Sequence, residues 1–99
     1  MAASARVLSP GIPVRRAPGV LWREGEFGVV VLAPGSSEPQ TLTGTGRALW
    51  HALARPIAID ELVAELARAF GVDPARVEVD IAPVLEELHR IGAIDQEPG

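Results

Sequence analysis

The chain has 99 residues, a length that suits one domain, and its formal net charge is −4. It contains no cysteine and no lysine, which excludes disulfides, thiolate metal sites, cysteine nucleophiles, Schiff-base lysines and P-loop lysines. Residues 1–46 carry four arginines against three acidic residues, whereas residues 47–99 carry five arginines against ten. The acidic second half argues against nucleic acid as a partner, because phosphates would be repelled.

No apolar run approaches the roughly 20 residues that span a bilayer, and the first residues lack the hydrophobic region of a signal peptide. We therefore expect a cytoplasmic protein with no membrane partner.

Residues 1–18 contain three prolines and little periodicity, so we predict an extended N-terminal arm. Whether this arm pairs with the sheet stays open. Short strands are predicted at 20–24, 27–32 and 40–43, joined as an antiparallel meander. The middle segment does not alternate apolar and polar residues, so we expect a central strand with both faces covered. A meander of three strands leaves two open edges.

The second half has the apolar periodicity of helices. A first helix is predicted over about 44–54, and a second over about 61–70 with Gly71 as its stop. The predicted N-caps are Thr43 or Thr45 for the first helix and Asp60 for the second.

A third helix is predicted to begin after Asp73, with Pro74 at its first position, and to end near 91–92. Pro83 lies inside this helix, where it removes one backbone hydrogen bond and crowds the carbonyl of Val79. We therefore predict a break or kink between Val79 and Pro83.

The motifs that could carry catalysis are weak. The segment Gly44-Thr45-Gly46 lies between a strand and a helix, but it lacks the third glycine of a dinucleotide loop. His51 and His89 are far apart in sequence, and no spacing suggests the three or four ligands of a metal site. We predict no catalytic residue, no cofactor and no metal site, so the chain is not expected to be an enzyme.

Two binding functions fit this pattern. Three helices after a small sheet are typical of a winged-helix module of a regulator, which binds DNA or another protein, although acidic helices argue against DNA. The alternative uses an open strand edge, which can bind an extended peptide through main-chain hydrogen bonds. Such an edge can also be short and harmless, and the residues alone do not separate these readings.

Residues 20–94 resemble the PqqD-like family, the peptide-recognition elements of ribosomal peptide maturation. The segments that carry the resemblance are Gly28–Leu32, Leu42–Gly46 leading into Ala48–Trp50, Ile59–Leu66, and Val79–Leu88 followed by Ile91–Ile94. The resemblance implies an α+β, winged-helix-like fold in which a three-stranded antiparallel sheet precedes three helices. It divides the chain into an arm (1–18), a recognition domain (19–95) and a C-terminal tail (96–99). This chain departs from the family at Ala58, where a capping threonine is usual, and at Thr43, where asparagine is common.

The resemblance also implies a non-catalytic function. The leader segment of a precursor peptide would add as a strand to the third strand and lie against the third helix. The implied peptide-binding residues are Gln40, Thr41, Leu42 and Thr43 on the strand and Val77, Asp80, Ile81, Val84 and Leu88 on the helix. The partners would be this leader and a separate radical SAM or peptidase-type maturation enzyme, because this chain lacks the cysteines for such chemistry.

Overall fold

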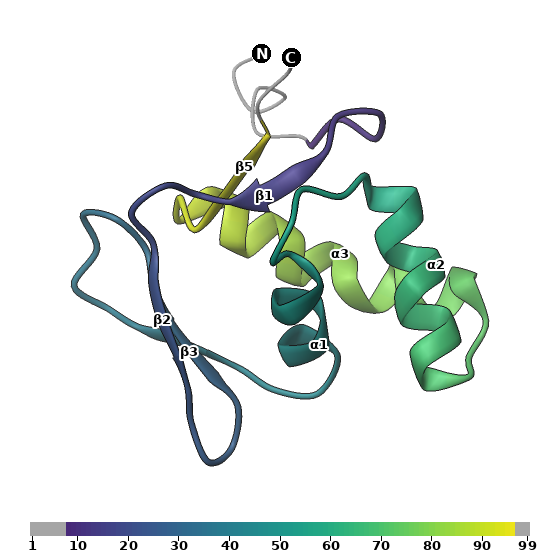
Figure 1. Ribbon diagram of the computed structural model, residues 1–99, viewed down its shortest axis with the longest axis horizontal. Coiled ribbons are helices and arrows are strands. Elements are labelled where there is room, and N and C mark those ends of the chain that lie inside the picture. The colour runs from purple at the N-terminus through teal and green to yellow at the C-terminus, as the bar shows by residue number, and fades with distance from the viewer. Residues whose placement is uncertain (1–7, 97–99) are drawn as a thin grey trace.

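The computed structural model describes residues 8–96, and it combines two small antiparallel sheets with three helices (Figure 1). The elements in chain order are β1 (Val14–Arg16), β2 (Leu21–Glu24), β3 (Val29–Leu32), β4 (Gln40–Leu42), α1 (Thr45–Ala52), α2 (Ile59–Phe70), α3 (Pro74–Arg90) and β5 (Ile94–Gln96). The expected α+β architecture, a three-stranded antiparallel meander followed by three helices, is confirmed.

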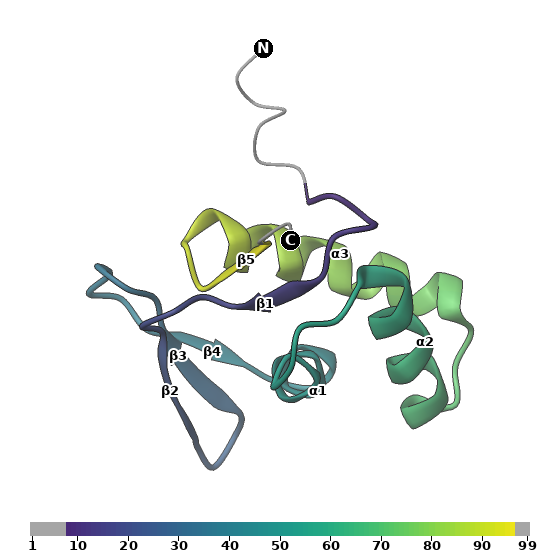
Figure 2. The ribbon, with the colours of Figure 1, turned by 45° about the horizontal axis from the view of Figure 1, so that its top comes forward.

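The meander has the strand order β2-β3-β4, so the prediction that the valine-rich strand is central is confirmed. Burial along β3 alternates, because Val29 and Val31 are buried whereas Val30 and Leu32 are half-buried. The expectation that both faces are covered is therefore wrong. Only one face of β3 meets the core, since the β2–β3 hairpin projects away from the helices (Figures 1 and 2).

The second sheet pairs β1 with β5, and the sequence analysis predicted neither strand. Val14 is fully buried, and its N–H and C=O exchange hydrogen bonds of 2.8 and 3.0 Å with Ile57. Arg15 forms a 2.7 Å ion pair with Asp95 on the partner strand. Residues 14–16 of the expected arm therefore pair with the end of the chain and not with the meander.

The predicted N-caps of the first two helices are wrong. Gly44 is the N-cap of α1 with a φ of 54°, and Ala58 is the N-cap of α2; neither has a side-chain capping hydrogen bond. Thr43 contributes its backbone carbonyl, which accepts from the N–H of Gly46 at 2.9 Å. Asp60 lies inside the first turn of α2, where its charge suits the positive end of the helix dipole.

The N-cap of α3 is confirmed, since the Asp73 side chain accepts a 2.8 Å hydrogen bond from the N–H of Ala75. The stop at Gly71 is also confirmed, with a left-handed φ of 66°. The predicted break at Pro83 is wrong, because α3 continues through it from Pro74 to Arg90, whereas the kink stays a prediction. Proline removes a single backbone hydrogen bond, and buried side chains on both sides of it hold the two halves against the same core.

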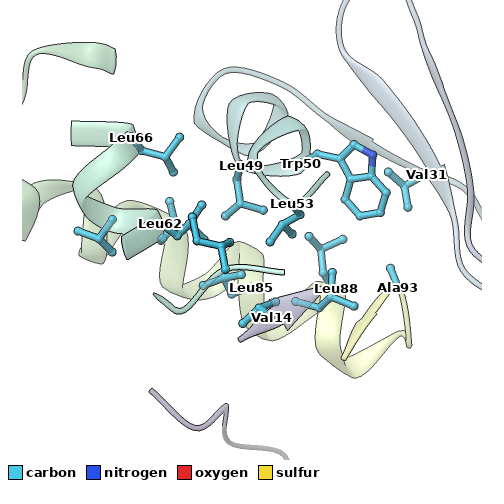
Figure 3. Close-up of a cluster of buried hydrophobic side chains, with 14 of the residues drawn as sticks. Val14, Val31, Leu49, Trp50, Leu53, Leu62, Leu66, Leu85, Leu88 and Ala93 are labelled. Carbon is cyan, nitrogen blue, oxygen red and sulfur yellow. The ribbon is translucent and has the colours of Figure 1, made fainter. Parts of the chain in front are cut away.

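The core lies where α1, α2 and α3 meet the inner face of β3 and the buried side of β1. Figure 3 shows Trp50 of α1 beside Val31 of β3, with Leu62 and Leu66 of α2 on the other side of the cluster. The ten large side chains with the least exposure are Trp50, Leu49, Leu53, Leu62, Ile81, Leu88, Ile94, Val14, Val29 and Val31. Because every helix contributes to this cluster, α3 is fixed relative to the end of the meander.

Candidate functional site

The outer edge of β4 has no neighbouring strand among the described residues 8–96. A Cβ placed on Gly28 would lie 2.2 Å from the carbonyl oxygen of Leu42, so this carbonyl is on the β3 side of the strand. Backbone groups of successive strand residues point to opposite sides. The N–H and C=O of Thr41 therefore point to the open edge, where an extended chain could pair with them.

The edge of β4 meets α3 at the first turn of α1. A Cβ placed on Gly46 would lie 3.6 Å from Cβ of Leu42 and 3.8 Å from Cγ1 of Val84. Leu42 and Val84 are both half-buried, so each keeps apolar surface in contact with solvent. We call Leu42, Gly46 and Val84 the β4–α3 junction. It places apolar side chains beside the unpaired backbone of β4.

The nine peptide-binding residues implied by the sequence fall into two groups. Val77, Ile81 and Leu88 are only 1–2% exposed and lie in the core, where they support α3. The other six keep solvent contact: Thr41, Thr43 and Asp80 are exposed, and Gln40, Leu42 and Val84 are half-buried. Of these six, Leu42 and Val84 lie on either side of Gly46 in the first turn of α1.

Carboxylates flank the junction on α3. Asp80, Val84 and Glu87 follow the i, i+4, i+7 spacing that puts residues on one side of a helix. Asp80 lies 3.6 Å from the guanidinium of Arg76, and Arg90 donates a 3.0 Å hydrogen bond to Glu87. This hydrogen bond lowers the pKa of Glu87 below its ordinary value. Each carboxylate beside the junction therefore has an arginine partner about one turn away.

Arg16 joins β1 to the aromatic residues of β2 and α1, and the sequence analysis did not single it out. Its guanidinium carbon lies 4.7 Å from the ring centre of Trp22 and 4.9 Å from that of Trp50. Its Nη2 also donates a 2.7 Å hydrogen bond to the carbonyl of Trp50. Partial burial lowers the pKa of Arg16 below its ordinary value. Trp50 is fully buried, whereas Trp22 is 40% exposed.

Glu24 connects the end of β2 to α1. One carboxylate oxygen lies 2.9 Å from Nε2 of His51, and the other pairs with Arg47. His51 also lies edge-on to Trp22, with ring centres 5.8 Å apart. Within residues 8–96, no group of three or more His, Asp or Glu side chains is arranged to hold a metal ion. None of the helices in this part of the chain combines the length and the apolar character that a membrane span needs.

Comparison with protein families gives one match. A family model described as coenzyme PQQ synthesis protein D (PqqD) matches residues 28–94, which is more than half of the chain. The chain belongs to the PqqD family. The match includes β4, the β4–α3 junction and the whole of α3. The PqqD resemblance expected from the sequence motifs is confirmed.

A solved structure supports the fold assignment of this PqqD-family chain. The chain is similar to the PqqD truncation of Methylobacterium extorquens PqqCD, with a TM-score of 0.74 and 24% sequence identity. The alignment covers 91% of this chain and 96% of that chain. That protein, solved by solution NMR, is described as a functional and stand-alone recognition element for ribosomally synthesised and post-translationally modified peptides (RiPPs). No curated protein sequence matches the chain.

Proposed function

We propose that this PqqD-family chain binds the leader segment of a ribosomally synthesised precursor peptide. The leader adds as a strand to β4, and the complex is presented to a separate maturation enzyme. Two findings support this function: the family match, and the description of the similar Methylobacterium extorquens structure as a RiPP recognition element. The observation that carries the binding mode is the open edge of β4 next to the half-buried side chains of Leu42 and Val84.

Strand addition supplies affinity through main-chain hydrogen bonds and specificity through alternate side chains. Thr41 directs its N–H and C=O to the added strand. Leu42 pairs with the buried Val29, so its side chain is on the face of the sheet that meets the helices. A leader residue opposite Leu42 would point to this same face and contact Val84. The leader is therefore held by backbone pairing on one side and by α3 on the other.

The proposal assigns no catalytic step to this chain. It has no cysteine, so it cannot supply thiolate ligands for the iron–sulfur cluster of a radical SAM enzyme. The proposed partner is a maturation enzyme of the radical SAM or peptidase type.

The direct test is calorimetric titration with a synthetic leader peptide from a precursor encoded beside this protein. We expect binding at micromolar concentration. Thr41→Pro removes the outward N–H, and we expect it to weaken binding about tenfold, because one main-chain hydrogen bond contributes about 1–1.5 kcal/mol. The matched control Thr41→Val keeps the N–H and should bind like the wild type. Circular dichroism checks that both variants are folded.

Two outcomes contradict the proposal. The leader could fail to bind at micromolar concentration, or Thr41→Pro could bind as tightly as Thr41→Val. The alternative function, a winged-helix module of a regulator, is tested by a gel shift with duplex DNA. We expect no shift, and salt-sensitive DNA binding would favour the alternative.

A further inference from the structure

The meander has a second face, which turns away from the helices. Trp22 of β2 lies edge-on to Trp50 of α1, and Glu24 pairs with side chains of the same helix. Because side chains alternate along a strand, Leu21 and Arg23 point to the opposite face. In Figures 1 and 2 the β2–β3 hairpin projects from the body, with the three helices to one side of it. Leu21 and Arg23 therefore lie on the side of the sheet that the helices do not use.

Most of the side chains on this second face are apolar. Cross-strand partners share a face: Leu21 pairs with Leu32, and Arg23 pairs with Val30, which pairs with Thr41. We call these five residues the outer sheet face. Leu21 is 64% exposed, and Val30 and Leu32 are half-buried, so all three keep apolar surface in contact with solvent. Neighbouring exposed apolar side chains are typical of a surface that contacts another protein.

Arg23 is the charged residue of the outer sheet face. It has no ion-pair partner within residues 8–96, whereas its neighbour Glu24, on the inner side, pairs with two side chains of α1. An apolar surface with one unpaired cation is complementary to a protein surface that carries a carboxylate among apolar residues. It does not suit a nucleic acid, which requires several cations against its phosphates.

The proposed leader strand would extend the outer sheet face. Leu42 points to the inner side, so a leader residue opposite Thr41 points outward, in the same row as Thr41, Val30 and Arg23. The next outward leader residue is two positions away. Strand addition thus widens the outer sheet face from three strands to four, and the added row is present only while the leader is bound.

We propose that the maturation enzyme docks on the outer sheet face, with an acidic residue against Arg23, and that outward side chains of the bound leader complete this docking surface. The inference rests on the proposed strand addition at β4. An enzyme on this face leaves the α3 side of the leader undisturbed, because α3 lies on the inner side of the sheet. The enzyme therefore binds the leader-loaded chain more tightly than the empty chain.

The test measures binding of the full chain to the maturation enzyme encoded beside the same precursor, with and without the leader. We expect the leader to raise enzyme affinity several-fold, and linkage requires the enzyme to raise leader affinity by the same factor. Leu21→Glu should weaken enzyme binding about tenfold, because it places a charge in the apolar contact. The matched control is Val79→Glu, since Val79 is 70% exposed on α3 and lies outside the outer sheet face. It should leave enzyme binding unchanged.

A charge reversal tests the arginine separately. Arg23→Glu should weaken enzyme binding about tenfold, because it replaces an attraction to the enzyme's carboxylate with a repulsion. The matched control is Arg68→Glu, at an exposed arginine of α2. All four substituted side chains are exposed, so melting temperatures and leader affinities measured without enzyme should stay close to the wild type.

Failure of this inference can be distinguished from failure of the proposed function. If the leader binds but Leu21→Glu and Arg23→Glu both bind the enzyme like the wild type, the inference is wrong and strand addition stands. An equal loss of enzyme binding in Val79→Glu would also contradict it. If the wild type sediments as a dimer that Leu21→Glu dissociates, a second copy of the chain covers this face and the inference is wrong. If the wild type binds no leader, the proposed function fails and the inference fails with it.

Discussion

The two open edges of the meander, β2 and β4, differ in what lies beside them. β2 is exposed along its whole length, and Leu21 is 64% exposed on a hairpin that projects from the body (Figure 1). β4 leads directly into α1, and Gly46 in the first turn of α1 lies close to both Leu42 of β4 and Val84 of α3. A strand added to β2 would lie on a hairpin that projects from the body, whereas a strand added to β4 would lie beside the half-buried side chains of Leu42 and Val84. The nearby helix α3, and not an unpaired edge by itself, therefore distinguishes the candidate site.

The β2 edge also carries charged residues that discourage pairing with another chain. Arg23 and Glu24 occupy half of this short strand, and Glu24 is held by Arg47 and His51. Its neighbour Trp22 packs on Arg16. The inner face of β2 is thus used for attachment to α1 and β1.

The largest expected effect distinguishes a buried residue of α3, Ile81, from a half-buried one, Val84. Ile81→Asp puts an unpaired carboxylate at a site that is 1% exposed, and we expect a loss of about 4 kcal/mol or more, enough to unfold a small domain. Val84→Asp changes a half-buried position and should leave a folded protein that no longer binds the leader. Thermal unfolding followed by circular dichroism, together with titration, measures both. A folded Ile81→Asp variant would show that this position is not core.

A smaller loss is expected where β4 approaches β3 most closely. Gly28→Ala introduces a Cβ 2.2 Å from the carbonyl oxygen of Leu42, so the two strands must move apart at a cost of about 1–3 kcal/mol. Urea unfolding measures this change, with Gly11→Ala as the control in open space. Equal stability of the two variants would mean that the β3–β4 spacing is not fixed at this point.

Changes on the β2 side should leave the β4 edge intact. Arg16→Met removes the hydrogen bond to Trp50 and the contacts with two aromatic rings, and we expect a loss of about 1–2 kcal/mol. Tryptophan fluorescence should follow the unfolding, and Arg23→Met on exposed β2 is the control. Leader affinity of the folded Arg16→Met protein should equal that of the wild type. A large loss of leader affinity in Arg16→Met would show that the β2 side of the molecule affects binding at the β4 edge.

The smallest effect concerns the exposed end of α3. Arg90 lowers the pKa of Glu87, so the stabilisation from this pair is present above the carboxyl's unfolded-state pKa and is lost as pH falls through its folded-state pKa. Arg90→Ala should return the pKa of Glu87 toward its ordinary value. Side-chain NMR titration measures this shift, and Arg55→Ala is a distant control that should leave it unchanged. An unaltered pKa in Arg90→Ala would contradict the hydrogen-bonded pair.

Sequence patterns predicted the elements whose apolar residues repeat over several turns or along a strand. They missed the elements that depend on tertiary contacts. The meander and the three helices follow from periodicity over many residues, but β1 and β5 are three residues each and exist through pairing with one another. The N-cap at Ala58 was missed because the first turn of α2 begins before its acidic residues. For β1 and β5, the pairing of distant segments decided the local structure.

Only the strand side of the candidate site was predictable from the sequence. The edge of β4 followed from counting strands, since a meander must end in an unpaired strand. The α3 side could not be resolved, because Ile81 and Val84 belong to one apolar stripe and only the position of α1 separates core from junction.

The pairing of β1 with β5 has a consequence for how the chain can be joined. Val14 begins β1 and lies opposite Gln96 at the end of β5. The side-chain amide of Gln96 also donates hydrogen bonds of 2.6 and 2.7 Å to the carbonyls of Ser9 and Ile12. A short artificial loop could therefore close the ends of the domain, and new termini could be opened in the projecting turn between β2 and β3. A circular permutant of this kind would keep every helix in its present sequence order.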